Sequence, residues 1–76
     1  MIKSKLGPGL VVKDVIILEQ YIDEAILEVG SDYGLVLENV SERILHSNCS
    51  DALKANAIGK GSWYRKKIFD TIELRK

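Results

Sequence analysis

The 76-residue chain carries eleven basic and eleven acidic side chains, so its formal net charge at pH 7 is zero, and 46% of its residues are hydrophobic. This composition is typical of one folded domain, and it excludes a disordered chain. The single cysteine, Cys49, excludes an intrachain disulfide, and His46 alone beside it leaves too few ligands for a structural zinc site. Because so short a chain buries little surface, we expect it to gain stability as a homodimer.

The charges are divided between the two halves of the chain. Residues 1–45 carry four basic and eight acidic side chains, a net charge of −4, whereas residues 46–76 carry seven and three, a net charge of +4. This asymmetry indicates either an anionic partner for the basic half or a solvated basic face. The longest aliphatic run, Val15 to Leu18, is far shorter than the ~20 residues of a membrane span. Since no targeting segment is visible, we expect an intracellular, cytoplasmic protein.

The first half of the chain predicts an amphipathic helix after an irregular arm. The arm, residues 1–9, ends in Gly-Pro-Gly, which is typical of a turn, and residues 10–12 suit a short strand. Asp14 is a suitable N-terminal cap for a helix that runs to about Val29. Two strands over residues 15–29 are the alternative, because β-branched residues are frequent there. The apolar positions of the helix recur at spacings of three and four: Val15, Leu18, Ile22, Ala25, Ile26 and Val29.

A second helix is predicted from Tyr33 to Leu45. Gly30 suits the left-handed position that ends a helix, and Ser31 or Asp32 can cap the next one. A hairpin around residues 31–34 is the alternative, since a glycine at position 34 weakens a helix by about 1 kcal/mol relative to alanine. The apolar positions repeat at intervals of four, three and four: Tyr33, Leu37, Val40 and Ile44.

Residues 50–69 predict a helix, a tight turn and a second helix. The first helix covers residues 50–57, and Ser50 is placed to accept a hydrogen bond from its free amides. Gly59-Lys60-Gly61 forms the turn, in which the two glycines supply the backbone freedom of a sharp reversal. Ser62 opens the second helix in the same way as Ser50 opens the first. This order of elements is the layout of a DNA-reading helix-turn-helix.

The second of these helices presents two different faces. Tyr64 and Ile68 lie four residues apart, so they share a face that we expect to point into the core. Arg65, Lys66 and the end of Trp63 then point to solvent, where cationic groups can neutralise phosphates.

The last residues predict a small β component. Apolar and polar side chains alternate from Ile68 to Arg75, which suits a strand. A helix that places Tyr64, Ile68 and Ile72 on one face is the alternative. The predicted fold class is therefore mainly α with a small β component, in a single domain over residues 1–76.

The segment 57–65, Ala-Ile-Gly-Lys-Gly-Ser-Trp-Tyr-Arg, resembles the turn and the start of the recognition helix in helix-turn-helix regulators. Ala57 takes the small position, Ile58 the buried aliphatic position of the turn, and Ser62 the helix start. The chain as a whole resembles the small winged helix-turn-helix transcription regulators of archaeal viruses and plasmids, which are short, cysteine-poor and self-repressing. The resemblance covers residues 50–69. It implies a winged fold, duplex DNA as the partner and a DNA contact by Arg65.

Two features depart from the pattern of this family. Lys67 lies four residues after Trp63, where a buried aliphatic residue is usual. Only seven residues follow Phe69, fewer than a full two-stranded wing contains. In a second register, residues 50–58 form the reading helix and residues 62–74 form the wing. In that register two further side chains, Lys54 and Asn56, lie in the DNA groove.

The sequence therefore predicts a sequence-specific DNA-binding transcription regulator that acts as a dimer on a two-fold operator. It predicts no catalytic activity, because His46 and Cys49 lack an orienting group, and it predicts no cofactor, metal or small-molecule substrate. The alternatives are a protein-interaction module without nucleic-acid binding and a small β-barrel that binds RNA. The predicted DNA-binding residues are Lys54, Asn56, Lys60, Ser62, Trp63, Arg65, Lys66 and Lys67.

Overall fold

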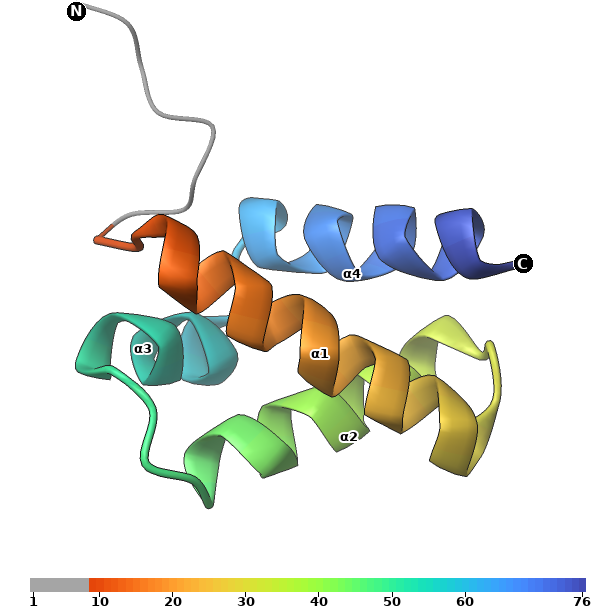
Figure 1. Ribbon diagram of the computed structural model, residues 1–76, viewed down its shortest axis with the longest axis horizontal. Helices are drawn as coiled ribbons and strands as arrows, with labels where there is room; N and C mark the ends of the chain where they lie inside the picture. Colours follow the sequence, from red (N-terminus) through yellow and green to blue (C-terminus); the bar gives the residue numbers. More distant parts are fainter. Residues whose placement is uncertain (1–8) are drawn as a thin grey trace, which may run out of the picture.

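The computed structural model describes residues 9–76, which form a bundle of helices around one core (Figure 1). Its elements are α1 (Val12–Val29), α2 (Tyr33–Leu45), α3 (Asp51–Gly59) and α4 (Ser62–Arg75). Helices α1 and α4 run in the same direction, α2 runs against both, and α3 lies at one end of the bundle (Figure 1). Helix α2 contacts each of the other three helices, and α1 also packs against α4.

The predicted β component, and with it the wing, is wrong. Helix accounts for 79% of the described residues, and no strand occurs among them. Residues 10–12 lead into α1 instead of forming a strand: Leu10 is buried in the core, Val11 is the N-cap and Val12 is the first helical residue. The predicted arm lies outside the described residues, apart from Gly9.

The C-terminal residues continue α4 to Arg75 rather than form a strand. Tyr64, Ile68 and Ile72 are each no more than 2% exposed, so their four-residue spacing forms one continuous buried stripe. This stripe has a helical period, and its burial outweighs the alternating pattern of the last eight residues. Residues 15–40 are likewise helical apart from the short loop between α1 and α2, so neither predicted hairpin alternative occurs.

The first three helices each begin with a polar side chain on their free amides. Asp32 caps α2 and Ser50 caps α3, at 3.0 and 3.1 Å from an amide three residues further on, as predicted. Asp14 acts from a different position than predicted, because the N-cap of α1 is Val11, three residues earlier. Its carboxylate accepts the Val11 amide at 3.2 Å and the Ser50 hydroxyl at 3.0 Å. The buried Asp14 therefore ties the start of α1 to the start of α3.

Two reversals depend on a positive φ angle. Gly30 ends α1 with φ of 84° and ψ of −162°, and its amide donates to Ile26 O, so the predicted glycine is used in a conformation other than the left-handed helical one. In the α3–α4 turn the predicted role of the glycines is wrong. The left-handed conformation falls on Lys60, with φ of 49° and ψ of 51°, while Gly59 is helical and Gly61 is extended.

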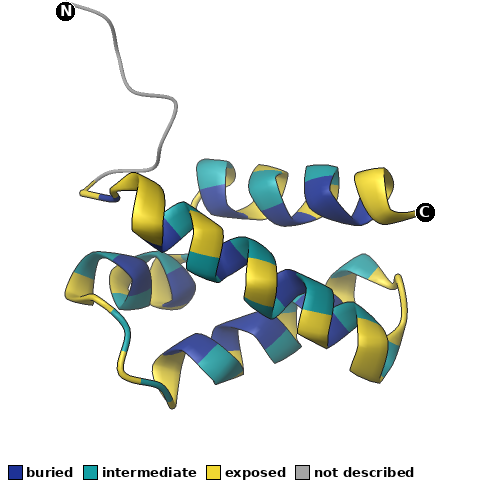
Figure 2. Ribbon diagram, viewed as in Figure 1, coloured by how far each residue is buried: buried dark blue, intermediate teal, exposed yellow. Residues whose placement is uncertain are grey.

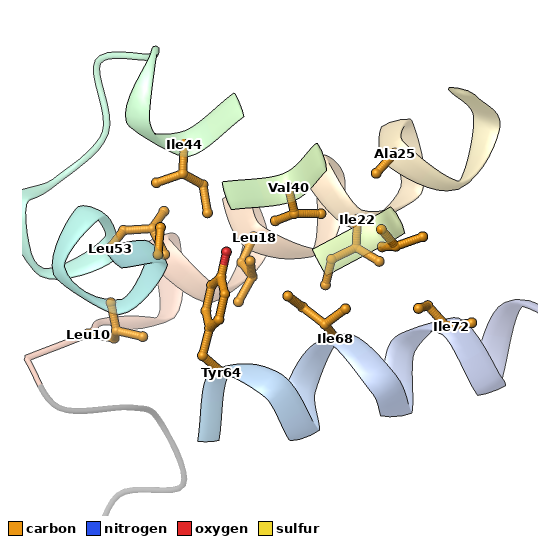
Figure 3. Close-up of a cluster of buried hydrophobic side chains, with 12 residues drawn as sticks. Leu10, Leu18, Ile22, Ala25, Val40, Ile44, Leu53, Tyr64, Ile68 and Ile72 are labelled. Carbon is orange, nitrogen blue, oxygen red and sulfur yellow. The ribbon is translucent and has the colours of Figure 1, made fainter. Parts of the chain in front are cut away.

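Each helix contributes to a single core, in which Tyr64 is the largest fully buried side chain (Figures 2 and 3). Tyr64 enters from α4, and its hydroxyl points toward α2 (Figure 3). There a buried hydrogen bond of 2.9 Å joins it to Ser41 Oγ. The bond satisfies two polar groups that have no access to water, which is why an aromatic side chain with a hydroxyl is tolerated here. The core residues are Leu10, Leu18, Ile22, Ala25, Val36, Val40, Ile44, Leu53, Ala57, Tyr64, Ile68 and Ile72.

Burial raises the pKa of Tyr64 from 10.0 to about 12, and this shift links stability to alkaline pH. The unfolded chain releases the phenolic proton near pH 10 and the folded chain near pH 12, so the folded state holds more protons between these values. The protonated phenol therefore contributes to the free energy of unfolding below pH 10. This contribution, about 2–3 kcal/mol in total, is lost as the pH rises from 10 to 12. Urea denaturation across this window should show that loss, and Tyr64→Phe should lack it. An equal decline in both proteins would contradict the assignment, since lysine titration is common to both.

The Ser41–Tyr64 bond is also testable near neutral pH. Tyr64→Phe leaves the Ser41 hydroxyl buried without its partner, so we expect a loss of about 1–3 kcal/mol in the free energy of unfolding. Adding Ser41→Ala should recover part of this loss, because neither polar group then remains. Fully additive single and double variants in urea denaturation would show that the two groups do not interact.

Candidate nucleic-acid interface

The two predicted helices are present as α3 and α4, and only Lys60 and Gly61 separate them. This linker is shorter than the turn of three or four residues in DNA-binding helix-turn-helix motifs. The predicted burial of Ile58 in the turn is wrong, because this side chain is 69% exposed at the end of α3. Helix α4 packs mainly on α1 and α2 rather than on α3, while α2 supports both α3 and α4. The orientation of α4 is therefore set by the α1–α2 pair.

The eight predicted DNA-binding residues fall into two groups by exposure. As predicted, Tyr64 and Ile68 face the core, while Arg65 and Lys66 are exposed and Trp63 packs partly against the core. The exposed group is Ser62, Arg65 and Lys66, and the half-buried group is Lys54, Asn56, Lys60, Trp63 and Lys67.

Three of these side chains are held by other residues. Lys67 Nζ lies 2.6 Å from Glu19 Oε2 of α1, and its side chain is only 27% exposed. Lys66 pairs with Asp70 at 3.0 Å one turn along α4, and Asn56 donates to Ala52 O at 2.8 Å within α3. The side chain of Lys67 is much less exposed than that of Lys66, 27% against 77%, because it faces the acidic helix α1.

A second ion pair also joins the basic end of the chain to α1. Arg75 Nε lies 2.5 Å from Asp23 Oδ1, and this carboxylate raises the pKa of the guanidinium. The −4 and +4 halves of the chain are therefore partly neutralised against each other inside the fold. Lys54, Lys60 and Arg65 form no ion pair within residues 9–76.

The start of α4 is electropositive for two independent reasons. Its N-cap is Gly61 and not the predicted Ser62, so no side chain caps the helix, and its first turn contains no acidic residue. The positive end of the helix dipole is therefore not offset there as it is in α1, α2 and α3. Arg65 and Lys66 follow within the next turn and Lys60 precedes it, which concentrates positive charge at this end.

One residue of this surface was missed in the sequence. Phe69 is 49% exposed and lies one turn beyond Arg65, on the outward side of α4. Its ring meets Tyr33 of α2 edge-on, with centroids 6.0 Å apart. In a helix, Phe69 shares a face with Arg65 because the two lie four residues apart. The strand predicted for this part of the chain hid that relation.

The remaining charged cluster fastens α1 to α2. Arg43 lies 3.0 Å from Glu24 and 3.1 Å from Glu28, and Asn39 donates to Glu28 at 2.6 Å. The Asn39 hydrogen bond, and then the Arg43 charge, hold the pKa of Glu28 below its ordinary value. The cluster is thus occupied in joining two helices.

His46 and Cys49 have separate surroundings. His46 Nε2 lies 3.6 Å from Glu42 Oε1, whereas Cys49 Sγ lies 4.0 Å from the Tyr21 hydroxyl. Within residues 9–76 no group of three or more His, Cys, Asp or Glu side chains is arranged to hold a metal ion. None of the helices in this part of the chain combines the length and the apolar character of a membrane span.

Comparisons of the chain with protein-family models, with curated proteins and with solved structures found no match. Any functional conclusion must therefore come from the chemistry of the described residues.

The Lys67–Glu19 pair is expected to contribute to the docking of α4 on α1. Because both side chains are partly exposed, a double-mutant cycle with Lys67→Ala and Glu19→Ala should give a coupling of about 0.2–1 kcal/mol. The coupling should shrink as salt is added, since the pair is accessible to screening ions. The Lys66–Asp70 pair, which lies within one helix, is the matched control and should leave the docking of α4 unchanged. A coupling of zero at low salt would show that the contact does not stabilise the fold.

Proposed function

We propose that the protein binds duplex DNA through the start of α4, with Lys60, Ser62, Arg65 and Lys66 as the contact residues. The observation that carries this proposal is the concentration of positive charge at the uncapped, electropositive end of that helix. Phosphate groups are the ligands that such a helix terminus and cationic side chains bind together. Lys67 is left out of the contact set, because Glu19 holds its ammonium group and its side chain is only 27% exposed, whereas the side chain of Lys66 is 77% exposed although it pairs with Asp70.

This arrangement is unfavourable for the folded chain by itself. Cations near the start of a helix oppose its dipole, at a cost of about 0.3–1 kcal/mol each. Lys60 adds backbone strain, since a non-glycine residue in the left-handed conformation costs roughly 1–2 kcal/mol. A bound polyanion turns this electrostatic cost into a gain, because its negative charges attract both the cations and the positive end of the helix dipole. The cost in the free protein therefore supports an anionic ligand for this surface.

Among the possible polyanionic ligands, the shape of α4 favours duplex DNA. A helix fits the major groove, and residues of its N-terminal part contact base edges in helix-turn-helix proteins. Arg65 is exposed on the outward side of α4, and a guanidinium can donate two hydrogen bonds to guanine. Ser62 and Lys66 are exposed beside it and are suited to phosphates. We propose that such binding regulates transcription and that the protein acts in the cytoplasm, as the sequence predicts.

Arg65→Glu tests the contact surface, with Lys76→Glu as the matched control at the opposite end of α4. Both changes alter the net charge equally, but only Arg65 belongs to the proposed surface. Fluorescence anisotropy with a labelled duplex should show a loss in affinity of at least about tenfold for Arg65→Glu and little change for Lys76→Glu. Wild-type affinity should fall steeply between about 50 and 200 mM salt. Equal affinities of the two variants would sink the proposal, as would the absence of any binding by the wild type.

Lys60→Gly should separate stability from binding. Glycine relieves the left-handed strain, so the free energy of unfolding should rise by up to about 1 kcal/mol, while DNA affinity should fall because a phosphate contact is lost. Lys60→Gln is the control: it removes the charge and keeps the strain, so it should weaken binding without stabilising the fold. In both variants the slope of log affinity against log salt concentration should become shallower by about one. Unchanged DNA affinity in both variants would exclude Lys60 from the interface.

A protein-interaction module remains the second candidate, because several large aliphatic side chains are exposed. Leu27, Leu74 and Ile58 are 88%, 78% and 69% exposed, and their burial by a protein partner would be favourable. This candidate predicts no salt-dependent binding to duplex DNA, so the Arg65→Glu experiment also discriminates between the two functions.

A further inference from the structure

Phe69 lies at the centre of the helix face that is proposed to contact DNA. At about 100° per residue, its position is about 20°, 40° and 60° away from Ser62, Arg65 and Lys66 around the axis of α4. The residue is 49% exposed. A duplex that contacts these three polar side chains would therefore cover Phe69 as well.

Helix α2 holds the ring of Phe69 without covering it. The ring meets that of Tyr33 edge-on, with an angle of 67° between the two planes. Because this contact already restricts the ring, little further conformational entropy is lost when a ligand covers its exposed part. Burial of the remaining apolar surface is favourable.

The face that contains Phe69 ends at an acidic residue. Glu73 lies one turn further along α4, about 40° from Phe69 around the axis, and pairs with Lys76 at 2.9 Å. The other carboxylate of this part of the helix, Asp70, is about 140° from Arg65 and lies outside the face. Since a carboxylate repels phosphates, Phe69 is the last residue of the face that suits DNA.

An exposed phenyl ring on such a face has one complementary group in the major groove. The base edges there present hydrogen-bond donors and acceptors, and their apolar feature is the C5-methyl group of thymine. A phenyl ring cannot replace the hydrogen bonds that a polar base edge makes with water, so covering such an edge is unfavourable. The ring of Phe69 therefore favours thymine over the other three bases.

We propose that Phe69 reads the methyl group of a thymine close to the guanine contacted by Arg65. This base contact rests on the DNA binding proposed above for the start of α4, and it adds a sequence preference to that binding. The two residues are about 6 Å apart along the helix axis, and successive base pairs are about 3.4 Å apart. The thymine therefore lies within about two base pairs of the guanine.

Deoxyuridine tests the methyl contact, because uracil differs from thymine only in lacking this group. The probe is a duplex that the wild-type chain selects from a random pool, with each thymine replaced in turn, and affinity is measured by fluorescence anisotropy. At one thymine the replacement should weaken wild-type binding about fourfold, the value of one buried methyl group. Phe69→Ala should bind the thymine and uracil duplexes equally. Leu74→Ala, which shortens an exposed apolar side chain on another face of α4, is the matched control and should keep the wild-type ratio.

A second variant and a second base analogue complete the test. Phe69→Gln replaces the ring with a polar side chain that favours helix, so it should also lose the discrimination, and circular dichroism checks that both Phe69 variants stay folded. Replacing guanine with 7-deazaguanine removes the N7 acceptor that an arginine contacts. The guanine at which this replacement weakens binding should lie within about two base pairs of the sensitive thymine.

The outcomes separate the thymine contact from DNA binding itself. If no deoxyuridine weakens wild-type binding, or if the loss persists in Phe69→Ala, the thymine contact is overturned, while a weakened Arg65→Glu variant still supports DNA binding by α4. A sensitive thymine far from every sensitive guanine overturns its placement beside Arg65. Absence of DNA binding by the wild type overturns both proposals.

Discussion

The docking of α4 on the α1–α2 pair is the contact on which the rest of the structure depends. It is made by Tyr64, Ile68 and Ile72, and it is fixed in rotation by the buried hydrogen bond from Tyr64 to Ser41. An apolar stripe alone tolerates some sliding or rotation of a helix. A buried polar pair does not, because a small displacement leaves both groups without a partner. The hydroxyl therefore gives α4 one orientation.

That orientation determines the role of each cation in the basic run. Neighbouring helical residues point about 100° apart, so a buried Tyr64 forces Arg65 outward and brings Lys67 round to α1. There Lys67 meets Glu19, which explains why three consecutive basic residues do not act as one patch. The same rotation places Phe69 outside, against Tyr33. Core packing, rather than the local sequence, thus selects which charges remain available to a ligand.

The sequence was sufficient for some of these features and insufficient for others. Helix α2, most of helix α3 and the caps at Asp32 and Ser50 followed from local patterns, because capping and periodicity depend on nearby residues. The strand expected at the end of the chain was wrong because periods of two and 3.6 are hard to separate over eight residues. The Lys67–Glu19 pair joins residues 48 apart, so no local pattern contains it. The left-handed Lys60 was missed because two glycines flank it.

One feature of the folded chain is unfavourable in isolation. The start of α4 concentrates positive charge where the helix dipole opposes it. The fold cannot relieve this repulsion by rotating α4, because the buried stripe of Tyr64, Ile68 and Ile72 and the hydrogen bond from Tyr64 to Ser41 hold the helix in one orientation. An anionic ligand at the start of α4 would reverse the unfavourable charge interaction without any change in the core.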